Sequence, residues 1–449
     1  MFDYDSLKAM GRSIGRPVKD LLALAPNNDP FYAGVGARRC AAEWFAEIWK
    51  QHGEPGSHLR RLHYRLVSTT TLCKPDGRPY NNTEGDWSYL ITASLAARYL
   101  DLVPFDGLVD RRNDEPMIFA ENMETDPDQE IQVGCEVQDD EPLTEEVKRP
   151  EMPNLPWLYL DIDAPVQKYI VEVWIEKSTQ NDWLVPLCQQ RGVNLVIGIG
   201  EQSEIRSREL ALRSAKYGAP VRIIYLSDFD PGGRSMPKAV ARKVEFTIAK
   251  FDLDVDLQLI PLALTPGQCR EYRLPRTPIK ETERRKDKFE QIFGVGATEL
   301  DAMEALYPGE LARLLEAELN NWLDPSLHVR FSGLRSDLRL RLLTTEHGIH
   351  ARHTHEIEAL QMEFETITDE IATVASMLDD WEERAGELWQ RIADEIDEQR
   401  PDLSGVEVPR SLAPGETDRF VLFDSRRDYF TQIDAYNAWR DGDENGEAA

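Results

Sequence analysis

Cysteine is scarce in this sequence, and long apolar runs are missing. The five cysteines are scattered through 449 residues and none forms a CxxC pair, which argues against a zinc ribbon and against a disulfide framework. No apolar run is long enough to span a membrane. The first twenty residues, MFDYDSLKAMGRSIGRPVKD, lack the apolar block of a signal peptide. These absences predict a cytoplasmic protein with no membrane partner.

Basic residues are outnumbered, with 52 Lys and Arg against 81 Asp and Glu, so the formal charge is −29. Nucleic-acid binders usually carry a basic surface, and the net charge argues against that class. The basic residues are clustered, however, and charges in physiological salt are screened beyond about 8 Å. The clusters cover residues 58–65, 206–243, 270–288 and 329–341. A basic face can therefore act independently of acids elsewhere, and nucleic-acid binding stays possible.

The first part of the chain has the pattern of a small helical domain. Residues 1–33 form a lead-in that ends in a loop rich in Pro and Asn, and residues 34–120 follow as one domain. Apolar residues recur at helical spacing in three segments, namely 37–50, 58–68 and 84–100. Short apolar runs broken by Pro and Asp-Gly in 101–112 are typical of a β-ribbon. Three helices and a ribbon predict a winged-helix domain.

The middle of the chain predicts an α/β domain. Residues 121–156 are acidic and are interpreted as a linker or an inserted hairpin, and residues 157–335 follow as the α/β domain with a helical extension. Near-continuous apolar runs predict strands over 169–177, 194–200, 221–227 and 255–264. Helical patterns occupy 182–192, 204–218 and 237–251 between them, and 298–323 after them. Strands that alternate with helices predict a parallel sheet.

The last part, residues 336–449, is predicted to be a helical region with a tail. Residues 354–398 have the pattern of one long, acidic, amphipathic helix, for which a bend near 377–380 stays open. Such a helix could pack on the body of the protein or pair with a second copy.

Acidic residues follow two of the predicted strands. Glu176 ends the first strand, and Asp228 and Asp230 end the third, where alternation makes both aspartates point the same way. In open α/β sheets these strand ends carry function, and carboxylate oxygens favour Mg²⁺. An isolated DxD more often begins a turn or caps a helix. The upstream Glu176 and the Gly-rich turn at 198–203 favour a magnesium site instead.

The stretches VEVWIEK, GIGEQS and SDFDPGG resemble a known family. A glutamate after the first strand and DxD after the third are typical of a Toprim domain, and the three stretches are similar to the Toprim half of the A subunit of type IIB DNA topoisomerases (topoisomerase VI). Glu299, within TELDAME, resembles a glutamate in a later helical motif of that family. The resemblance covers about residues 37–323, so the C-terminal helix and tail lie outside it.

The resemblance implies a nucleophilic tyrosine on a helix of the winged-helix domain. The stretch RRLHY matches the family's motif of Arg, any residue, an apolar residue, an aromatic residue and Tyr, except that His63 replaces the aromatic residue. Tyr64 would attack a backbone phosphate and form a 5′-phosphotyrosyl bond, with Arg60 and Arg61 holding the phosphate. Tyr80 is the alternative nucleophile.

The same resemblance implies the cofactor and the partners. Glu176, Asp228 and Asp230 would bind Mg²⁺, and Glu176 would also transfer a proton. In the family the tyrosine of one subunit meets the acids of another, which implies a homodimer that acts on double-stranded DNA. The sequence contains no convincing ATPase signature, so strand passage would need a separate ATPase subunit.

Two other functions stay open. A Toprim nuclease would hydrolyse DNA with metal-bound water and without a covalent step, and a DNA-binding module would use the acids only structurally. The four histidines between His347 and His355 are interpreted as a solvated or DNA-facing patch in preference to a metal site. Residues 270–288 form either a phosphate-contacting loop or a solvated one.

Overall fold

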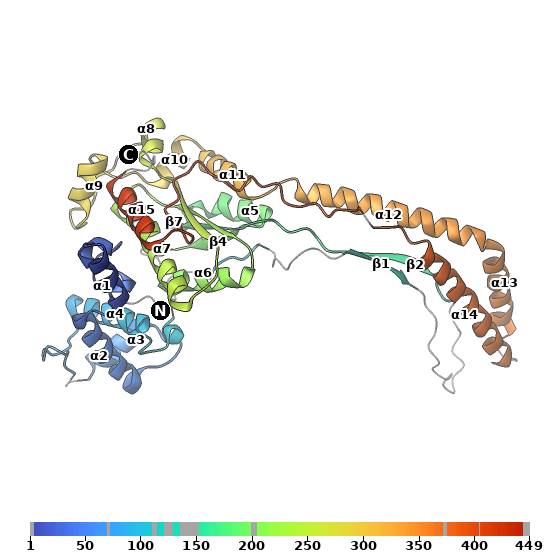
Figure 1. Cartoon of the computed structure of the whole chain (residues 1–449), viewed down its shortest axis with the longest axis horizontal. Coiled ribbons are helices and arrows are strands. Elements are labelled where there is room, and N and C mark those ends of the chain that lie inside the picture. Colours follow the sequence, from blue (N-terminus) through green and yellow to red (C-terminus); the bar gives the residue numbers. More distant parts are fainter. Residues whose placement is uncertain are drawn as a thin grey trace. The chain divides into compact units, whose positions relative to one another are not determined.

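The computed structural model divides the chain into two compact units (Figure 1). It describes residues 4–69, 72–109, 115–120, 129–134, 152–198, 204–370, 375–403 and 405–442. The first unit comprises Met1–Met123, Lys168–Leu323 and Ala413–Ala449. The second comprises Glu124–Gln167 and Asp324–Leu412. These units differ from the predicted boundaries, because 157–167 and 324–335 join the second unit and 413–449 joins the first.

A mostly parallel sheet lies at the centre of the first unit, in the order β4-β3-β5-β6-β7. The four predicted strands are confirmed as β3 (Ile170–Ile175), β4 (Asn194–Ile197), β5 (Val221–Leu226) and β6 (Leu257–Ala263). Every residue of these four strands is buried, which is why they read as continuous apolar runs. The antiparallel edge strand β7 (Phe423–Asp424) has two residues and was not predicted.

Helices follow the parallel strands as the sequence predicts. These are α5 (Asn181–Arg191) after β3, α6 (Glu204–Tyr217) after β4, and α7 (Pro231–Phe251) after β5. Helix α7 begins six residues before the predicted start, because Asp230 caps it and Pro231 fits its first turn. The remaining helices of this part are α8 (Pro266–Glu271), α9 (Lys286–Phe293), α10 (Leu300–Leu306), α11 (Glu310–Trp322) and α15 (Tyr429–Asp441).

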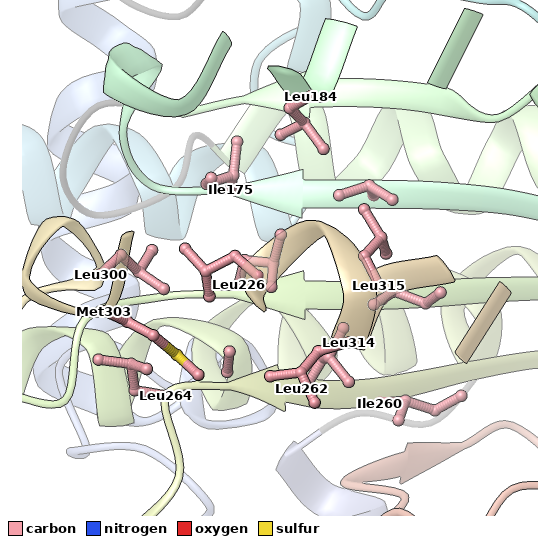
Figure 2. Close-up of a cluster of buried hydrophobic side chains, with 14 of the residues drawn as sticks. Ile175, Leu184, Leu226, Ile260, Leu262, Leu264, Leu300, Met303, Leu314 and Leu315 are labelled. Atoms are coloured by element: carbon pink, nitrogen blue, oxygen red, sulfur yellow. The ribbon is translucent and has the colours of Figure 1, made fainter. Parts of the chain in front are cut away.

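Helices α10 and α11 pack on one face of the sheet. Figure 2 shows side chains from the strands, such as Leu226 and Leu262, against Leu300, Met303 and Leu315 from these helices. All five side chains are buried. This apolar layer fixes the start of α10 close to the carboxyl ends of the strands, where the acidic residues lie.

The N-terminal part of the first unit is helical. It contains α1 (Tyr4–Ser13), α2 (Gly36–His52), α3 (Leu59–Val67) and α4 (Glu84–Tyr99), and the last three confirm the predicted helices. The β-ribbon predicted over 101–112 is wrong for its described residues, 101–109. They form a 3₁₀ turn at Phe105–Gly107 and one bridge between Leu108 and Ser57. Pro104 and the Asp-Gly pair shorten the apolar runs too much for paired strands.

The second unit combines a two-stranded sheet with three helices. Strands β1 (Gln129–Gly134) and β2 (Trp157–Ile162) are antiparallel. Strand β1 lies in the predicted linker or hairpin, whereas its partner β2 lies at the start of the predicted α/β domain. The helices are α12 (Leu327–Arg352), α13 (Thr354–Glu370) and α14 (Ala375–Glu398). Buried side chains from both strands and all three helices share one core.

The prediction of a single long helix over 354–398 is wrong. Helices α13 and α14 are antiparallel: Arg384 pairs with Glu363, and Arg391 pairs with Glu356. Residues 377–380, where a bend was left open, lie within α14, and residues 371–374 between the two helices lie outside the described residues. Both helices carry an apolar stripe, and each stripe is buried against the other and against the strand pair, which one straight helix could not achieve.

His353, between α12 and α13, predicts a pH dependence of this unit. Its ring nitrogens contact Glu356 at 2.8 Å and Glu395 of α14 at 2.6 Å, and these hydrogen bonds raise the pKa of His353. We expect the contribution, on the order of 1 kcal/mol, to be complete below the unfolded pKa and lost as pH rises through the raised pKa. Denaturant unfolding of the chain and of His353→Gln between pH 5 and 8 checks this. A difference between the two that is constant with pH would contradict it, and exposed His355→Gln is the control.

Candidate active site

The carboxyl ends of β3 and β5 place acidic residues at one edge of the sheet. The two strands are parallel neighbours with Ile175 opposite Leu226, so the residues that follow them leave the sheet together. The backbone N–H of Glu176 donates to the carbonyl of Leu226 at 3.3 Å, and Asp228 follows two residues later. The sequence prediction that these acids lie close together is consistent with this register.

Asp228 is buried, and both of its carboxylate oxygens have partners. One oxygen accepts from the backbone N–H of Leu300 at 2.8 Å, and the other lies 2.8 Å from the ammonium of Lys177. Burial raises the pKa of Asp228, although Lys177 and the Leu300 N–H work against that rise. The backbone directly after Asp228 is also held in place, because Phe229 and Thr298 exchange two hydrogen bonds.

Lys177 links Asp228 to Glu299, which precedes α10. Its ammonium lies 2.9 Å from the Glu299 carboxylate as well as 2.8 Å from that of Asp228. Burial alone would lower the pKa of Lys177, but hydrogen bonds to the two carboxylates and their charges raise it. The lysine therefore stays protonated and neutralises part of the acidic cluster. Lys177 was not predicted to have a role, although its place directly after Glu176 is a usable signal.

Asp230 is the N-cap of α7. Its carboxylate accepts from the backbone N–H of Gly233 at 2.6 Å, so the Pro-Gly-Gly stretch is the first helical turn and not a separate turn before the helix. Gly233 is required there, because a Cβ would lie 2.0 Å from the carbonyl oxygen of Asp228. The capping role that an isolated DxD suggests thus applies to Asp230, while its second oxygen stays available for another ligand.

Glu176 is the least satisfied acid of the cluster. Its Oε2 atom is buried and has no hydrogen-bond partner among the described residues. Burial, and next the charges of Asp228 and Asp230, raise the pKa of Glu176 to about 7. A carboxyl group with such a pKa exchanges a proton near neutral pH, which suits an acid–base role. The charges of Asp228 and Asp230 act on Glu176 in the same direction as burial, and the charge of Lys177 offsets them only in part.

The donor set fits a hard divalent cation, although it is not arranged around one. Glu176 offers an unpaired buried oxygen and Asp230 a second oxygen, and oxygen-only ligands suit Mg²⁺. Within the described residues, no group of three or more His, Cys, Asp or Glu side chains is gathered as a metal site. Lys177 occupies the Asp228 oxygen that such an ion would need. The predicted ligation of Mg²⁺ by Glu176, Asp228 and Asp230 therefore requires Lys177 to move.

The Gly-rich turn predicted beside this cluster lies mostly outside the described residues. Gly198 is described and donates its backbone N–H to the carbonyl of Ile175 at 2.9 Å, whereas residues 199–203 are not described. The turn therefore begins next to β3, as the sheet order requires.

Tyr64 lies on the exposed side of α3. Its side chain is 57% exposed, and its phenol makes no hydrogen bond with any described residue, while Leu62 and Leu66 on the opposite side are buried. Its ring lies beside that of His63, with the two centroids 5.4 Å apart. The tyrosine is therefore accessible to a ligand as large as DNA.

The two arginines of RRLHY are held locally. The guanidinium of Arg60 lies over the Trp87 ring, 5.4 Å from its centroid, and Arg61 pairs with Glu54 at 3.4 Å. Among the described residues, no hydrogen bond or ion pair joins Tyr64, Arg60 or Arg61 to the acid cluster of the same chain. The structure thus brings the acids together but keeps the tyrosine motif as a separate group.

Tyr80, the alternative nucleophile, is buried. Its hydroxyl lies 2.7 Å from Nδ1 of His63, and burial raises its pKa. The other ring nitrogen of His63 lies 3.2 Å from the Asn82 side chain. His63 therefore belongs to the core, and of the two tyrosines Tyr64 has the accessible phenol.

The histidine segment of the second unit has ordinary structural roles. His350 contacts the Pro156 carbonyl at 2.7 Å, His353 contacts two glutamates, and His347 and His355 are exposed. No metal-binding group of three such side chains occurs in the described part of the chain.

Comparisons with known proteins add no family to these observations. No protein-family model matches the chain, and no curated protein matches it. A search for membrane-crossing segments among the described helices also found none of sufficient length and apolarity.

Proposed function

We propose that this protein cleaves double-stranded DNA as a relative of the topoisomerase VI A subunit, with Tyr64 as nucleophile and the acids at the sheet edge as the magnesium site. The observation that carries the proposal is Glu176, whose buried oxygen has no partner among the described residues and whose pKa is raised to about 7 by burial and by the charges of Asp228 and Asp230. Perturbed acids at the carboxyl edge of a parallel sheet are typical of a catalytic site.

In the proposed reaction, the phenol oxygen of Tyr64 forms a bond to a backbone phosphorus and the bond from phosphorus to the 3′ oxygen breaks. The net proton transfer is from the phenol to the departing 3′ oxygen, which becomes a hydroxyl. Glu176 can give a proton to the departing 3′ oxygen and regain one from the phenol, because its pKa lies near 7. Bound Mg²⁺ would supply positive charge at the scissile phosphate. Arg60 and Arg61 would orient the phosphate.

A second copy of the chain would supply the tyrosine. Tyr64 has no contact with the acids of its own chain among the described residues, and an exposed phenol can reach the acids of a partner. The proposed enzyme is therefore a homodimer in which each site takes its tyrosine from one copy and its acids from the other. Passage of a second DNA segment through the break would further require a separate ATPase subunit.

The same separation favours a second candidate, a Toprim nuclease. The acids and Lys177 form a connected cluster without Tyr64, so the cluster could direct water to a phosphate by itself. Such an enzyme would leave free DNA ends and would not need a covalent step.

The test is a denaturing gel of supercoiled plasmid incubated with the full-length protein. With Mg²⁺, the proposal expects linear DNA whose 5′ ends carry covalently bound protein. Removing the metal with EDTA should abolish cleavage, and returning Mg²⁺ should restore it. Free ends would support the nuclease. No cleavage with Mg²⁺, Mn²⁺ or Ca²⁺ would contradict both enzymes and leave the DNA-binding module.

A further inference from the structure

Three helices of the first unit bring together three cations near a single acid of these helices, Asp441. Lys238 is half-buried on α7, and it makes no hydrogen bond or ion pair with any described residue. The cations nearest to it are Arg440 of α15 and Lys288 of α9, and both act on it by repulsion. Two acids act on Lys238 by attraction, and both already have a cation: Asp29 pairs with Arg242 at 3.1 Å and Asp441 with Arg440 at 2.8 Å. The group of Lys238, Lys288 and Arg440 therefore keeps an excess of positive charge.

Helices α7, α9 and α15, which carry these cations, lie close together (Figure 1). Arg234 of α7 donates to the Trp439 carbonyl at 2.9 Å, and the indole of Trp439 donates to the Arg234 carbonyl at 2.7 Å. Arg285, directly before α9, donates to the hydroxyl of Ser235. Ser235 and Lys238 lie three residues apart on α7, as Arg285 and Lys288 do at the start of α9, so each pair shares one side of its helix.

Burying a lysine that has no ion-pair partner among the described residues costs free energy. Repulsion from the neighbouring cations adds to that cost. Burial, and next the charges of Arg440 and Lys288, lower the pKa of Lys238 to about 8. Other lysines of α7 have partners: Lys243 pairs with Glu204 at 3.2 Å and Lys250 with Asp101 at 2.6 Å. Lys238 thus differs from its neighbours on the same helix, and an anion between the three cations would remove the repulsion.

We infer that Lys238, Lys288 and Arg440 form a binding site for a phosphate group, occupied by a backbone phosphate of bound DNA. The choice of DNA rests on the proposed function. Lys238 follows Asp230 by eight residues on α7, which is about 12 Å along the helix. That distance equals about three to four base steps of duplex, at 3.4 Å per phosphate on one strand. A strand whose scissile phosphate lies at the acids can therefore reach the three cations a few nucleotides away.

Two measurements on the full-length protein test this inference. The first is thermal unfolding of the wild type and Lys238→Met with and without inorganic phosphate. Without phosphate we expect Lys238→Met to unfold at the same or a higher temperature, because it loses a repelled charge. With phosphate the wild type should gain stability and the variant should not. A wild type that phosphate does not stabilise, or a variant stabilised equally, would overturn the site.

The second measurement is the salt dependence of binding to a labelled DNA duplex, followed by fluorescence anisotropy with Ca²⁺ in place of Mg²⁺. Loss of one phosphate contact should reduce the slope of log K against log salt by about 0.9 in Lys238→Met. Lys288→Met, at an exposed position, should have a similar effect, and Lys243→Met is the control for charge removed from the same helix. Equal slopes in Lys238→Met, Lys288→Met and Lys243→Met would overturn the inference while leaving DNA binding intact.

The two measurements separate failure of the inference from failure of the proposed function. A wild type that is stabilised by inorganic phosphate but binds no DNA would overturn both the proposed function and the assignment of the site to DNA, and would identify a free phosphate group as the ligand. If the wild type binds DNA and Lys238→Met has the same salt dependence of binding as the wild type, the inference is overturned and the proposed function is not.

Discussion

Replacing Tyr64 with Phe is expected to abolish covalent protein–DNA adducts and to lower the rate of DNA cleavage more than about 10³-fold. The physical reason is that the phenol oxygen is the proposed nucleophile, and Phe removes that atom alone. The side chain is 57% exposed and its hydroxyl has no described partner, so the fold should not change. Circular dichroism and the unfolding temperature check the fold, and a denaturing gel with end-labelled DNA measures the adduct.

Tyr159→Phe is the matched control, because Tyr159 is 54% exposed and lies in the second unit. Asp228→Asn tests the acid cluster in the way that Tyr64→Phe tests the nucleophile. It keeps the shape of the side chain but removes a negative charge from the cluster. The proposed function expects both Tyr64→Phe and Asp228→Asn to stop cleavage. Free ends that persist in Tyr64→Phe and disappear in Asp228→Asn would contradict the tyrosine mechanism and establish the nuclease.

The acid cluster was predictable from the sequence because it depends on short-range rules. Buried parallel strands appear as apolar runs, and their carboxyl ends lie at one edge, so Glu176 and Asp228 could be placed together. The partner of Lys177 was not predictable in the same way. Glu299 is 122 residues further along the chain, and only the packing of α10 on the sheet brings it within 2.9 Å.

The predictions that failed most clearly also depended on packing between segments far apart in the sequence. One amphipathic pattern over 354–398 is compatible with one long helix or with two antiparallel helices, because periodicity within a helix does not specify what covers its apolar side. The shared core with β1 and β2 selects the pair. Likewise, the lead-in and the C-terminal residues have no strong pattern of their own, yet they contact α7 through the buried Asp29 and the half-buried Tyr429.

Arg242→Met is expected to destabilise the protein by about 3–5 kcal/mol, the usual effect of breaking a buried ion pair. Arg242 and Asp29 are both fully buried, with Nε and Oδ2 3.1 Å apart, and Arg242 also contacts Glu245 and the hydroxyl of Tyr429. Without the guanidinium, two carboxylates remain in the core with no cation between them. Burial already raises the pKa of Glu245 despite Arg242, so this acid depends on the arginine to stay charged.

Denaturant unfolding at pH 7 measures the effect, and Arg39→Met is the control because the Arg39–Glu43 pair is exposed and contributes about 0.5 kcal/mol or less. The loss in Arg242→Met should shrink as pH falls, because burial raises the pKa of Glu245 and its protonation removes an unpaired charge. A double variant, Arg242→Met with Asp29→Asn, should recover part of the stability for the same reason. Equal losses in Arg242→Met and Arg39→Met would contradict the role of this pair in fixing residues 1–33 to α7.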